Sequence, residues 1–168
     1  LLKYSRMGKQ GIRLVPTPLQ GLIESLADGL SGELAEIGGK ISIANDLPWV
    51  LGDQTLLRQT FSNLLENAVM YRKIDTSLHI QIDWRADGEY TIIAVRDNGI
   101  GIPAEFHEKV FVLFQRLHSQ EAYPGTGIGL ATVRKSVDLL GGRVWVESQV
   151  DQGSVFNVRV LRADPDSA

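Results

Sequence analysis

Two segments of alternating apolar and polar residues flank an Asp-Gly pair, and they constrain the fold more than any other feature. The segment "SLHIQIDWR" (residues 77–85) precedes the pair and "EYTIIAVRD" (residues 89–97) follows it. An Asp-Gly pair readily adopts the positive φ angles of a tight hairpin turn. Alternation of this kind predicts strands with one face turned to a core. Together they predict an antiparallel strand pair.

The rest of the chain adds further strands and single helices. Strands are expected at residues 40–46, 143–148 and 154–160, the last two as a hairpin around "DQG". Helices are expected at residues 1–7, 18–37, 54–70, 103–114 and 126–140. Thr17 is predicted to cap the second helix with Pro18 as its first residue, and Asp53 to cap the third. The stretch "RLVPTPLQ" (residues 13–20), which leads into the second helix, is interpreted as a linker because Pro16 and Pro18 disfavour helix before them.

This order of elements predicts an α+β fold, a two-layer α/β sandwich in which a mixed, mostly antiparallel sheet carries its helices on one face. The chain has 168 residues, of which 43% are hydrophobic, so it is long enough for one domain with a proper core. Its first residue is not methionine and stands within a helical pattern, so we expect the sequence to be a piece of a longer protein.

Charge and cysteine content exclude several function classes. The formal net charge is −3, without the basic excess of a nucleic-acid-binding protein. There is no cysteine, which excludes disulfides and thiolate metal sites and is compatible with a reducing cytoplasm. No apolar run approaches the about 18 residues of a membrane span. We therefore expect a cytoplasmic domain without nucleic-acid or membrane contact.

Two asparagines stand one turn apart in the predicted helix "SNLLENAVMY". Asn63 and Asn67 lie beside its apolar stripe, which includes Leu57, Phe61 and Leu64. Asparagine costs a helix interior roughly 0.6 kcal/mol relative to alanine because its side chain competes for backbone hydrogen bonds. Either both are merely exposed helix residues, or their amide groups serve a site at the edge of the helix.

Two glycine-rich runs predict a nucleotide site. "DNGIGI" (residues 97–102) follows a predicted strand and "GTGIGL" (residues 125–130) opens a predicted helix. Glycine lets the backbone approach a ligand closely, and a helix N-terminus offers free N–H groups to phosphate. Neither run contains the lysine of a P-loop or the third glycine of a dinucleotide-binding fingerprint in its place. Each run alone is weak evidence, because an isolated glycine run is more often a structural turn than a nucleotide site.

In combination these motifs are more specific. "NLLENAVMY", "DNGIGI", "FVLF" and "GTGIGLA" occur in that order. They resemble the N box, first glycine box, F box and second glycine box of the histidine-kinase catalytic domain. That domain belongs to the ATPase superfamily shared with type II topoisomerases, Hsp90 and mismatch-repair proteins, whose fold is the Bergerat-type sandwich. The stretches "FQRLHSQEAYPGTGIGLA" and "GGRVWVES" are most similar to phytochrome-like kinases.

The resemblance implies a role for each matching residue. Asn67 would hold Mg²⁺ on the phosphates of ATP, Asn63 would support the phosphate end, and Arg116 would reach the phosphates from a lid at residues 115–125. Asp97 would accept a hydrogen bond from the adenine amino group, and Gly99 and Gly101 would leave room for the base. The other residues expected to contact the nucleotide are Ile102, Gly125, Thr126, Gly127, Gly129 and Leu130.

The sequence departs from the family pattern in two respects. Met70 stands where the family commonly has a phosphate-binding lysine, and the nearby candidates to take over that role are Arg72 and Lys73. The family phosphorylates a histidine on its first dimerisation helix, whereas His79, His107 and His118 have no such context. The acceptor histidine is therefore expected on a dimerisation domain that this chain largely lacks.

We accordingly predict three regions: residues 1–12 end a dimerisation helix and form a linker, 13–162 form the ATP-binding catalytic domain, and 163–168 are a disordered tail. The predicted function is transfer of the γ-phosphoryl group of ATP to a histidine. The alternative is a nucleotide-sensing or docking module without efficient phosphotransfer. An anti-sigma-type serine kinase is a third reading, against which the helix remnant "LLKYSRMG" argues.

The resemblance also implies partners and an assembly state. The expected partners are ATP, the protein's own dimerisation and phospho-acceptor domain, and the receiver domain of a response regulator. The full-length protein is expected to be a homodimer, and this chain by itself a monomer.

Overall fold

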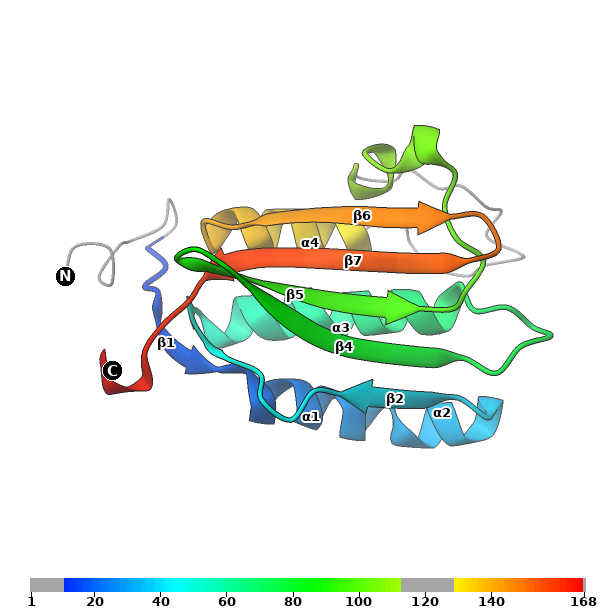
Figure 1. Ribbon diagram of the computed structural model, residues 1–168, viewed down its shortest axis with the longest axis horizontal. Helices are drawn as coiled ribbons and strands as arrows, with labels where there is room; N and C mark the ends of the chain where they lie inside the picture. Colours follow the sequence, from blue (N-terminus) through cyan, green and yellow to red (C-terminus); the bar gives the residue numbers. More distant parts are fainter. Residues whose placement is uncertain (1–10, 113–128, 168) are drawn as a thin grey trace.

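The computed structural model describes residues 11–112 and 129–167 (Figure 1). Five strands form the main sheet in the order β2-β4-β5-β7-β6, in which only β2 and β4 are parallel. Their bounds are β2 Lys40–Ile43, β4 His79–Asp87, β5 Tyr90–Asp97, β6 Arg143–Gln149 and β7 Gly153–Leu161. The helices are α1 Leu19–Gly29, α2 Ser31–Ile37, α3 Gln54–Met70 and α4 Gly129–Leu139.

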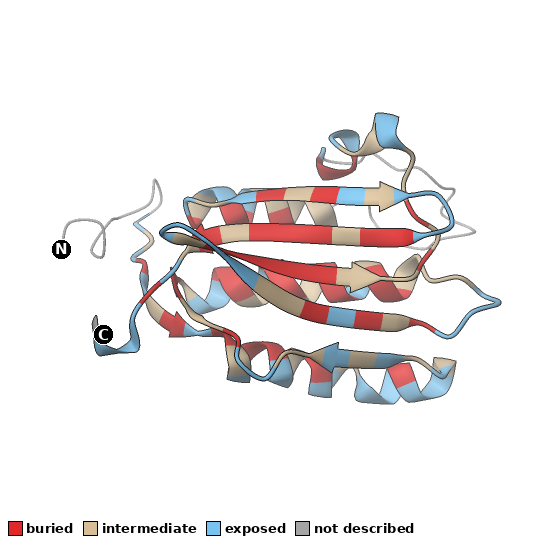
Figure 2. Ribbon diagram, in the orientation of Figure 1, coloured by how far each residue is buried: buried red, intermediate tan, exposed pale blue. Residues whose placement is uncertain are grey.

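The four α-helices of the described residues cover one face of this sheet, so the predicted two-layer sandwich is confirmed (Figure 1). Figure 2 shows buried residues both in the central strands of the sheet and in the helices. The largest side chains that are almost fully buried come from both layers: Phe61, Leu64 and Leu65 from α3, and Ile82, Ile93 and Phe156 from the strands. No helix among the described residues is both long and apolar enough to cross a membrane.

The central hairpin forms where it is predicted, but its two turn residues are Gly88 and Glu89 rather than the Asp-Gly pair, because Asp87 still belongs to β4. Asp87 pairs with Tyr90, which leaves a two-residue turn, and Gly88 has a φ of 61°. Because side chains alternate along a strand, Asp97 shares the core-facing side of β5 with buried Val95. The hairpin register therefore carries a carboxyl group to the helix-covered face at the end of β5.

The start of the domain differs from the prediction. The residues interpreted as a linker contain strand β1, Val15–Pro18, which pairs with β3, Trp49–Gly52, in a separate two-stranded sheet. Thr17 does not cap α1, because its hydroxyl donates to Val15 O at 2.9 Å. Pro18 is extended, with ψ of 132°, and so precedes the helix instead of opening it. A strand this short, with two prolines, has little signal in the sequence.

Two predicted helices are also corrected. The helix expected over residues 18–37 is interrupted at Leu30, where α1 gives way to α2. The helix expected over residues 103–114 consists, as far as it is described, of two 3₁₀ turns at Ala104–Phe106 and Lys109–Phe111, and Val112 is extended.

Other helix ends follow the predicted capping. Asp53 caps α3, since its Oδ1 accepts the Leu56 N–H at 2.9 Å. Gly38 ends α2 in the left-handed conformation, with a φ of 68°. The start of α4 predicted at residue 126 lies outside the described residues.

The C-terminal end of the chain is held more firmly than a disordered tail from residue 163 would be. Ala163 is buried, and its N–H donates to Trp49 O at 3.0 Å. Pro165–Ser167 form a 3₁₀ turn. The structure therefore corrects the predicted tail for these residues, because the edge of β3 offers the chain a partner.

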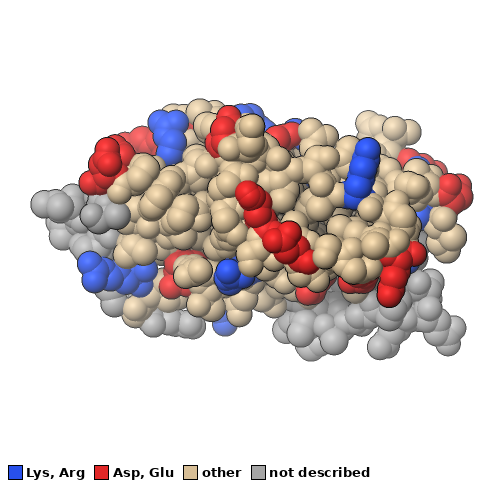
Figure 3. Space-filling model, turned by 90° about the horizontal axis from the view of Figure 1, so that it is seen from below, with Lys and Arg blue, Asp and Glu red and all other residues tan. Residues whose placement is uncertain are grey.

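Acidic and basic side chains are interspersed on the face shown in Figure 3, rather than gathered by sign. This distribution on the described part of that face agrees with a domain whose formal net charge is only −3.

Candidate nucleotide site

The predicted site residues of the described chain meet at one end of the sandwich. The C-terminal ends of β5 and α3 and the N-terminal end of α4 converge there, at the right of Figure 1. The Ile100 N–H donates to Tyr71 O at 3.0 Å, which ties the glycine loop after β5 to the residue that ends α3. The tertiary structure thus places the first glycine run beside the asparagine helix.

Asp97 is half-buried at the centre of this arrangement. Its Oδ1 accepts the Gly99 N–H at 2.9 Å. Burial raises the pKa of Asp97 from its usual 3.8 to about 6, although hydrogen bonds from the backbone N–H groups of Gly99 and Ser154 oppose that rise. A carboxyl withdrawn from water but fixed by two N–H groups is a well-oriented acceptor for a buried donor.

Gly99 and Gly101 are required by close backbone packing. A Cβ on Gly99 would lie 2.5 Å from Tyr71 O, and one on Gly101 would lie 2.0 Å from Gln149 O. Gly101 also has a φ of 75°. These distances show that both glycines let the loop pass between neighbouring backbones, so the structure assigns them a packing role in addition to any room they leave for a base.

Three polar residues that the sequence analysis missed hold this loop in place. Ser148 Oγ accepts the Ile102 N–H at 2.7 Å and lies 2.8 Å from Ser154 Oγ. Asn98 accepts the His79 N–H and donates to the Ser77 carbonyl, at 2.8 and 2.9 Å. The "DNG" run was the available signal for Asn98, whereas the two serines gave none because only strand pairing brings them to Asp97.

Asn63 and Asn67 lie half-buried on α3. Asn63 Nδ2 donates to the Gln59 carbonyl at 2.9 Å, and its Oδ1 would lie 3.4 Å from a Cβ on Gly129, at the start of α4. The carboxamide of Asn67 has no hydrogen-bond partner among the residues that the structure describes. Asn63 is therefore fixed at the α3–α4 contact, and the amide oxygen of Asn67 is available to a ligand.

The cations near Met70 are both engaged elsewhere. Arg72 Nη1 donates to the Val69 carbonyl at 2.8 Å, so its guanidinium folds back onto the end of α3. Lys73 Nζ donates to the Asp151 carbonyl in the β6–β7 turn. In this structure neither side chain replaces the lysine that the family commonly has at the position of Met70.

Several predicted site residues lie outside the described part of the chain. They are Arg116, Gly125, Thr126 and Gly127, together with the second half of the "FVLF" motif, the lid and His118. Of the second glycine run, Gly129 and Leu130 are described and form the start of α4, both half-buried. Gly129 lies beside Asn63 on α3, and Gly99 of the first glycine run lies against Tyr71 at the end of the same helix.

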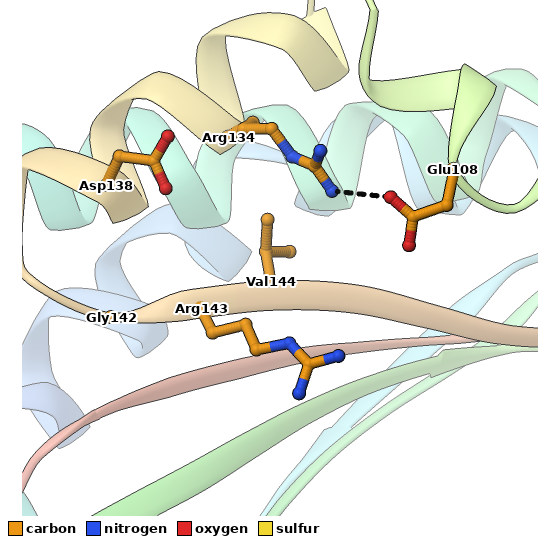
Figure 4. A pocket seen from close by; sticks show the side chains of 6 residues that line it. All are labelled: Glu108, Arg134, Asp138, Gly142, Arg143 and Val144. Carbon is orange, nitrogen blue, oxygen red and sulfur yellow. Dashed lines mark hydrogen bonds and ion pairs between the residues drawn. The ribbon is translucent and has the colours of Figure 1, made fainter.

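A separate polar cavity of about 310 Å³ lies between α4 and the edge strand β6 (Figure 4). Arg134 crosses it, paired with Glu108 at 3.3 Å and placed over the Phe111 ring at 4.7 Å. None of its lining residues is a predicted site residue. The described residues hold no group of three or more histidine, aspartate or glutamate side chains suited to a metal ion.

The close packing of Gly101 generates a stability prediction with an internal control. Gly101 and Gly141 share a φ of 75°, but a Cβ on Gly141 would have nothing within 4 Å. We expect Gly141→Ala to lower the free energy of unfolding by about 1 kcal/mol through its backbone conformation alone. Gly101→Ala should cost at least about 2 kcal/mol more through overlap with Gln149. Urea unfolding measures both, and equal losses would contradict the packing role.

The raised pKa of Asp97 predicts a pH-dependent stability. The folded state binds the proton more tightly than the unfolded state, so the contribution of Asp97 is full below about pH 4 and is lost as the pH rises through about 6. The free energy of unfolding of the wild type minus that of Asp97→Asn should therefore fall by on the order of 3 kcal/mol across this window.

Urea titrations of both proteins between about pH 4 and 7.5 test this, and taking the difference cancels the carboxyl groups that the two proteins share. A difference that stays constant with pH would show that Asp97 is not desolvated in the folded state.

Comparison with known proteins agrees with this geometry. Residues 52–164 match the family described as histidine kinase-, DNA gyrase B-, and HSP90-like ATPase. The chain is 38% identical over 157 residues to cyanobacterial phytochrome A of a Nostoc species, covering 93% of this chain and 20% of that protein. It is 36% identical over 157 residues to the methanogenesis regulatory histidine kinase FilI of Methanothrix harundinacea, covering 91% and 17%.

The structure is similar to full-length ShkA in complex with AMPPNP, with a TM-score of 0.76 and 28% identity over 92% of this chain and 32% of that one. The chain spans about a fifth of the length of the curated relatives. These findings confirm the predicted resemblance to histidine-kinase catalytic domains, including the phytochrome-like subgroup. The chain therefore belongs to the histidine kinase-, DNA gyrase B- and HSP90-like ATPase family.

Proposed function

We propose that this chain is the ATP-binding catalytic domain of a two-component sensor histidine kinase, which transfers the γ-phosphoryl group of ATP to a histidine of its dimerisation domain. The observation that carries the proposal is the position of the Asp97 carboxyl, buried at a strand end and held by two backbone N–H groups beside a close-packed glycine loop. The similarity to ShkA, whose structure contains AMPPNP, supports a nucleotide as the ligand.

The adenine end would be recognised by Asp97. In the proposed complex its free carboxylate lone pairs accept the exocyclic amino group, while Gly99 continues to donate to Oδ1. A guanine base presents a carbonyl oxygen at the equivalent position and would leave the buried carboxylate facing another acceptor. Such an unpaired contact is costly in a desolvated site, so Asp97 would select adenine.

The phosphate end would lie along α3 toward the start of α4. The free amide oxygen of Asn67 is a hard, neutral ligand that suits Mg²⁺, which keeps several waters and needs few protein ligands. Bound there, Mg²⁺ would neutralise phosphate charge. Asn63, fixed beside Gly129, would support this end, while Leu130 and Ile102 would line the nucleotide site.

Further roles are proposed for residues that the structure does not describe. Gly125, Thr126 and Gly127 would offer backbone N–H groups to the phosphates. Arg116 would reach them from the lid and stabilise charge on the transferring group. Chemistry of this kind depends mainly on positioning and charge neutralisation.

The proposal includes the partners that the family resemblance implies. The accepting histidine would come from a dimerisation domain, and the phosphoryl group would pass on to an aspartate of a response regulator. Full-length homodimers would form through that domain, and this chain alone would be a monomer. Because ATP is the phosphoryl donor, the domain would work in the cytoplasm.

A second candidate is a nucleotide-sensing or docking module without efficient phosphotransfer. It is favoured by one observation: Met70 is uncharged, and the nearby cations Arg72 and Lys73 are bonded to backbone carbonyls. Weak phosphate binding would slow phosphoryl transfer, but it would leave adenine recognition at Asp97 intact. The two candidates therefore predict the same base specificity and different transfer rates.

Binding of a fluorescent ATP analogue with Mg²⁺ tests the proposed site. We expect Asn67→Ala and Asp97→Ala to weaken binding at least about tenfold each, because each removes a contact to a charged or buried group. The effect of Asn67→Ala should require Mg²⁺, whereas that of Asp97→Ala should persist without it. Asn45→Ala, an exposed asparagine, serves as the matched control. Unchanged binding in both site variants would contradict the assignment.

Met70→Lys distinguishes the two candidates. A lysine at this position should strengthen binding of ATP about three- to tenfold, in the range of a charge-assisted hydrogen bond, and should leave binding of adenosine unchanged. Phosphotransfer to a separately supplied acceptor domain is measured in parallel. If Met70→Lys increases the rate of phosphotransfer, the second candidate, a module without efficient phosphotransfer, is supported. Efficient phosphotransfer by the wild type supports the kinase.

A further inference from the structure

Ser148, near the end of β6, forms a hydrogen-bond node that belongs to none of the four nucleotide-binding motifs. Its Oγ accepts the Ile102 N–H at 2.7 Å, donates to the Gly153 carbonyl at 2.8 Å and lies 2.8 Å from Ser154 Oγ. A serine hydroxyl has one proton and two lone pairs. When Ser154 donates to Ser148, these three contacts use the proton and both lone pairs, so the hydroxyl of Ser148 has a partner for every hydrogen bond that it can form.

The three partners of Ser148 stand around Asp97. Ile102 ends the glycine loop whose Gly99 N–H binds Asp97 Oδ1. Ser154 pairs with Asp97 across β5 and β7, and its own N–H binds the same carboxyl group. One hydroxyl therefore joins the loop on one side of the carboxyl to the strand on the other.

The β6–β7 turn is shaped to contact the same loop. Asp151 has a φ of 67°, the only non-glycine residue with a left-handed φ in the described chain. Its N–H donates to the Ile100 carbonyl at 2.8 Å, and its carbonyl accepts from Lys73. A strained conformation that persists beside a site is held by its surroundings, and here it brings the turn against the glycine loop.

Water cannot easily replace the Ser148 contacts. Ser154 is only 6% exposed, and a Cβ on Gly153 would lie 2.0 Å from the Asp97 carbonyl, so the strands leave no space between them. Removal of the hydroxyl would leave the Ile102 N–H without its partner and free the Ser154 hydroxyl to rotate. The loop and the strand would then no longer be held at a fixed separation across Asp97.

We propose that Ser148 is a positioning residue for base recognition: it holds the glycine loop and Ser154 in register around Asp97 and so sharpens the choice of adenine over guanine. Ser148 acts through these neighbours and does not itself touch the nucleotide. The inference rests on the proposed function, since it assumes that Asp97 binds adenine.

Competition against a fluorescent ATP analogue measures the effect of Ser148→Ala. The competitors are ATP, GTP and inorganic tripolyphosphate, which carries the charge of the phosphates without a base. We expect the affinity for ATP to fall about tenfold, the loss of one or two satisfied hydrogen bonds, with less than about twofold change for tripolyphosphate. The ratio of the affinity for ATP to the affinity for GTP should therefore fall.

Ser42→Ala is the matched control, because Ser42 is also a strand serine of the same sheet, but among the described residues its hydroxyl bonds only to the His79 ring, at 3.1 Å. Ser148→Thr keeps the hydroxyl and should restore the ATP preference. Should Ser148→Ala not fold, as judged by urea unfolding, Ser148→Cys replaces it, since a thiol has nearly the same shape and bonds weakly.

The possible results separate this inference from the proposed function. A wild type that binds no ATP analogue overturns both. A wild type that binds ATP while Ser148→Ala retains its affinity and its base preference overturns the inference alone. An equal loss of ATP and tripolyphosphate affinity also overturns it, because that would show a general structural role rather than one in base recognition.

Discussion

The carboxyl group of Asp97 is withdrawn from water and held by backbone N–H groups from two different segments. This interaction depends on the register of β4, β5 and β7, because a slip of one residue would turn the side chain to the opposite face of the sheet. It also depends on α3, which covers that face, and on the carbonyl of Tyr71 directly after α3, which anchors the loop. The hydrogen bonds that stabilise this end of the fold therefore also position the carboxyl group of the candidate site.

Close packing around the glycine loop explains why a binding loop can be rigid. Backbone of α3's end lies against Gly99, and backbone of the β6–β7 turn lies against Gly101. Ser148 and Asp151 add hydrogen bonds on the second side. A loop confined in this way loses little conformational entropy on binding, which favours a preorganised recognition site.

The strongly patterned parts of the fold were predictable. The central hairpin, the Asp53 cap and the apolar stripe of α3 follow from local chemistry, and each forms as predicted except that the hairpin turn lies one residue later, at Gly88 and Glu89. Strands β1 and β3 were missed because each has only four residues, too few for a clear alternating pattern. Each is stabilised as a strand by pairing with the other, which is distant along the chain. The break at Leu30 was also missed, since the apolar spacing continues through both α1 and α2.

For the site, the sequence by itself determined the residue types: two amide groups one helical turn apart, one carboxyl after a strand and two glycine runs. Motif order was sufficient to indicate the family that the comparisons confirm. Only the tertiary structure decided that Asp97 is desolvated, that Arg72 and Lys73 are turned to backbone carbonyls, and that Ser148 and Ser154 lie beside the carboxyl. Desolvation and hydrogen bonding depend on neighbours that are distant along the chain, and a linear pattern does not contain them.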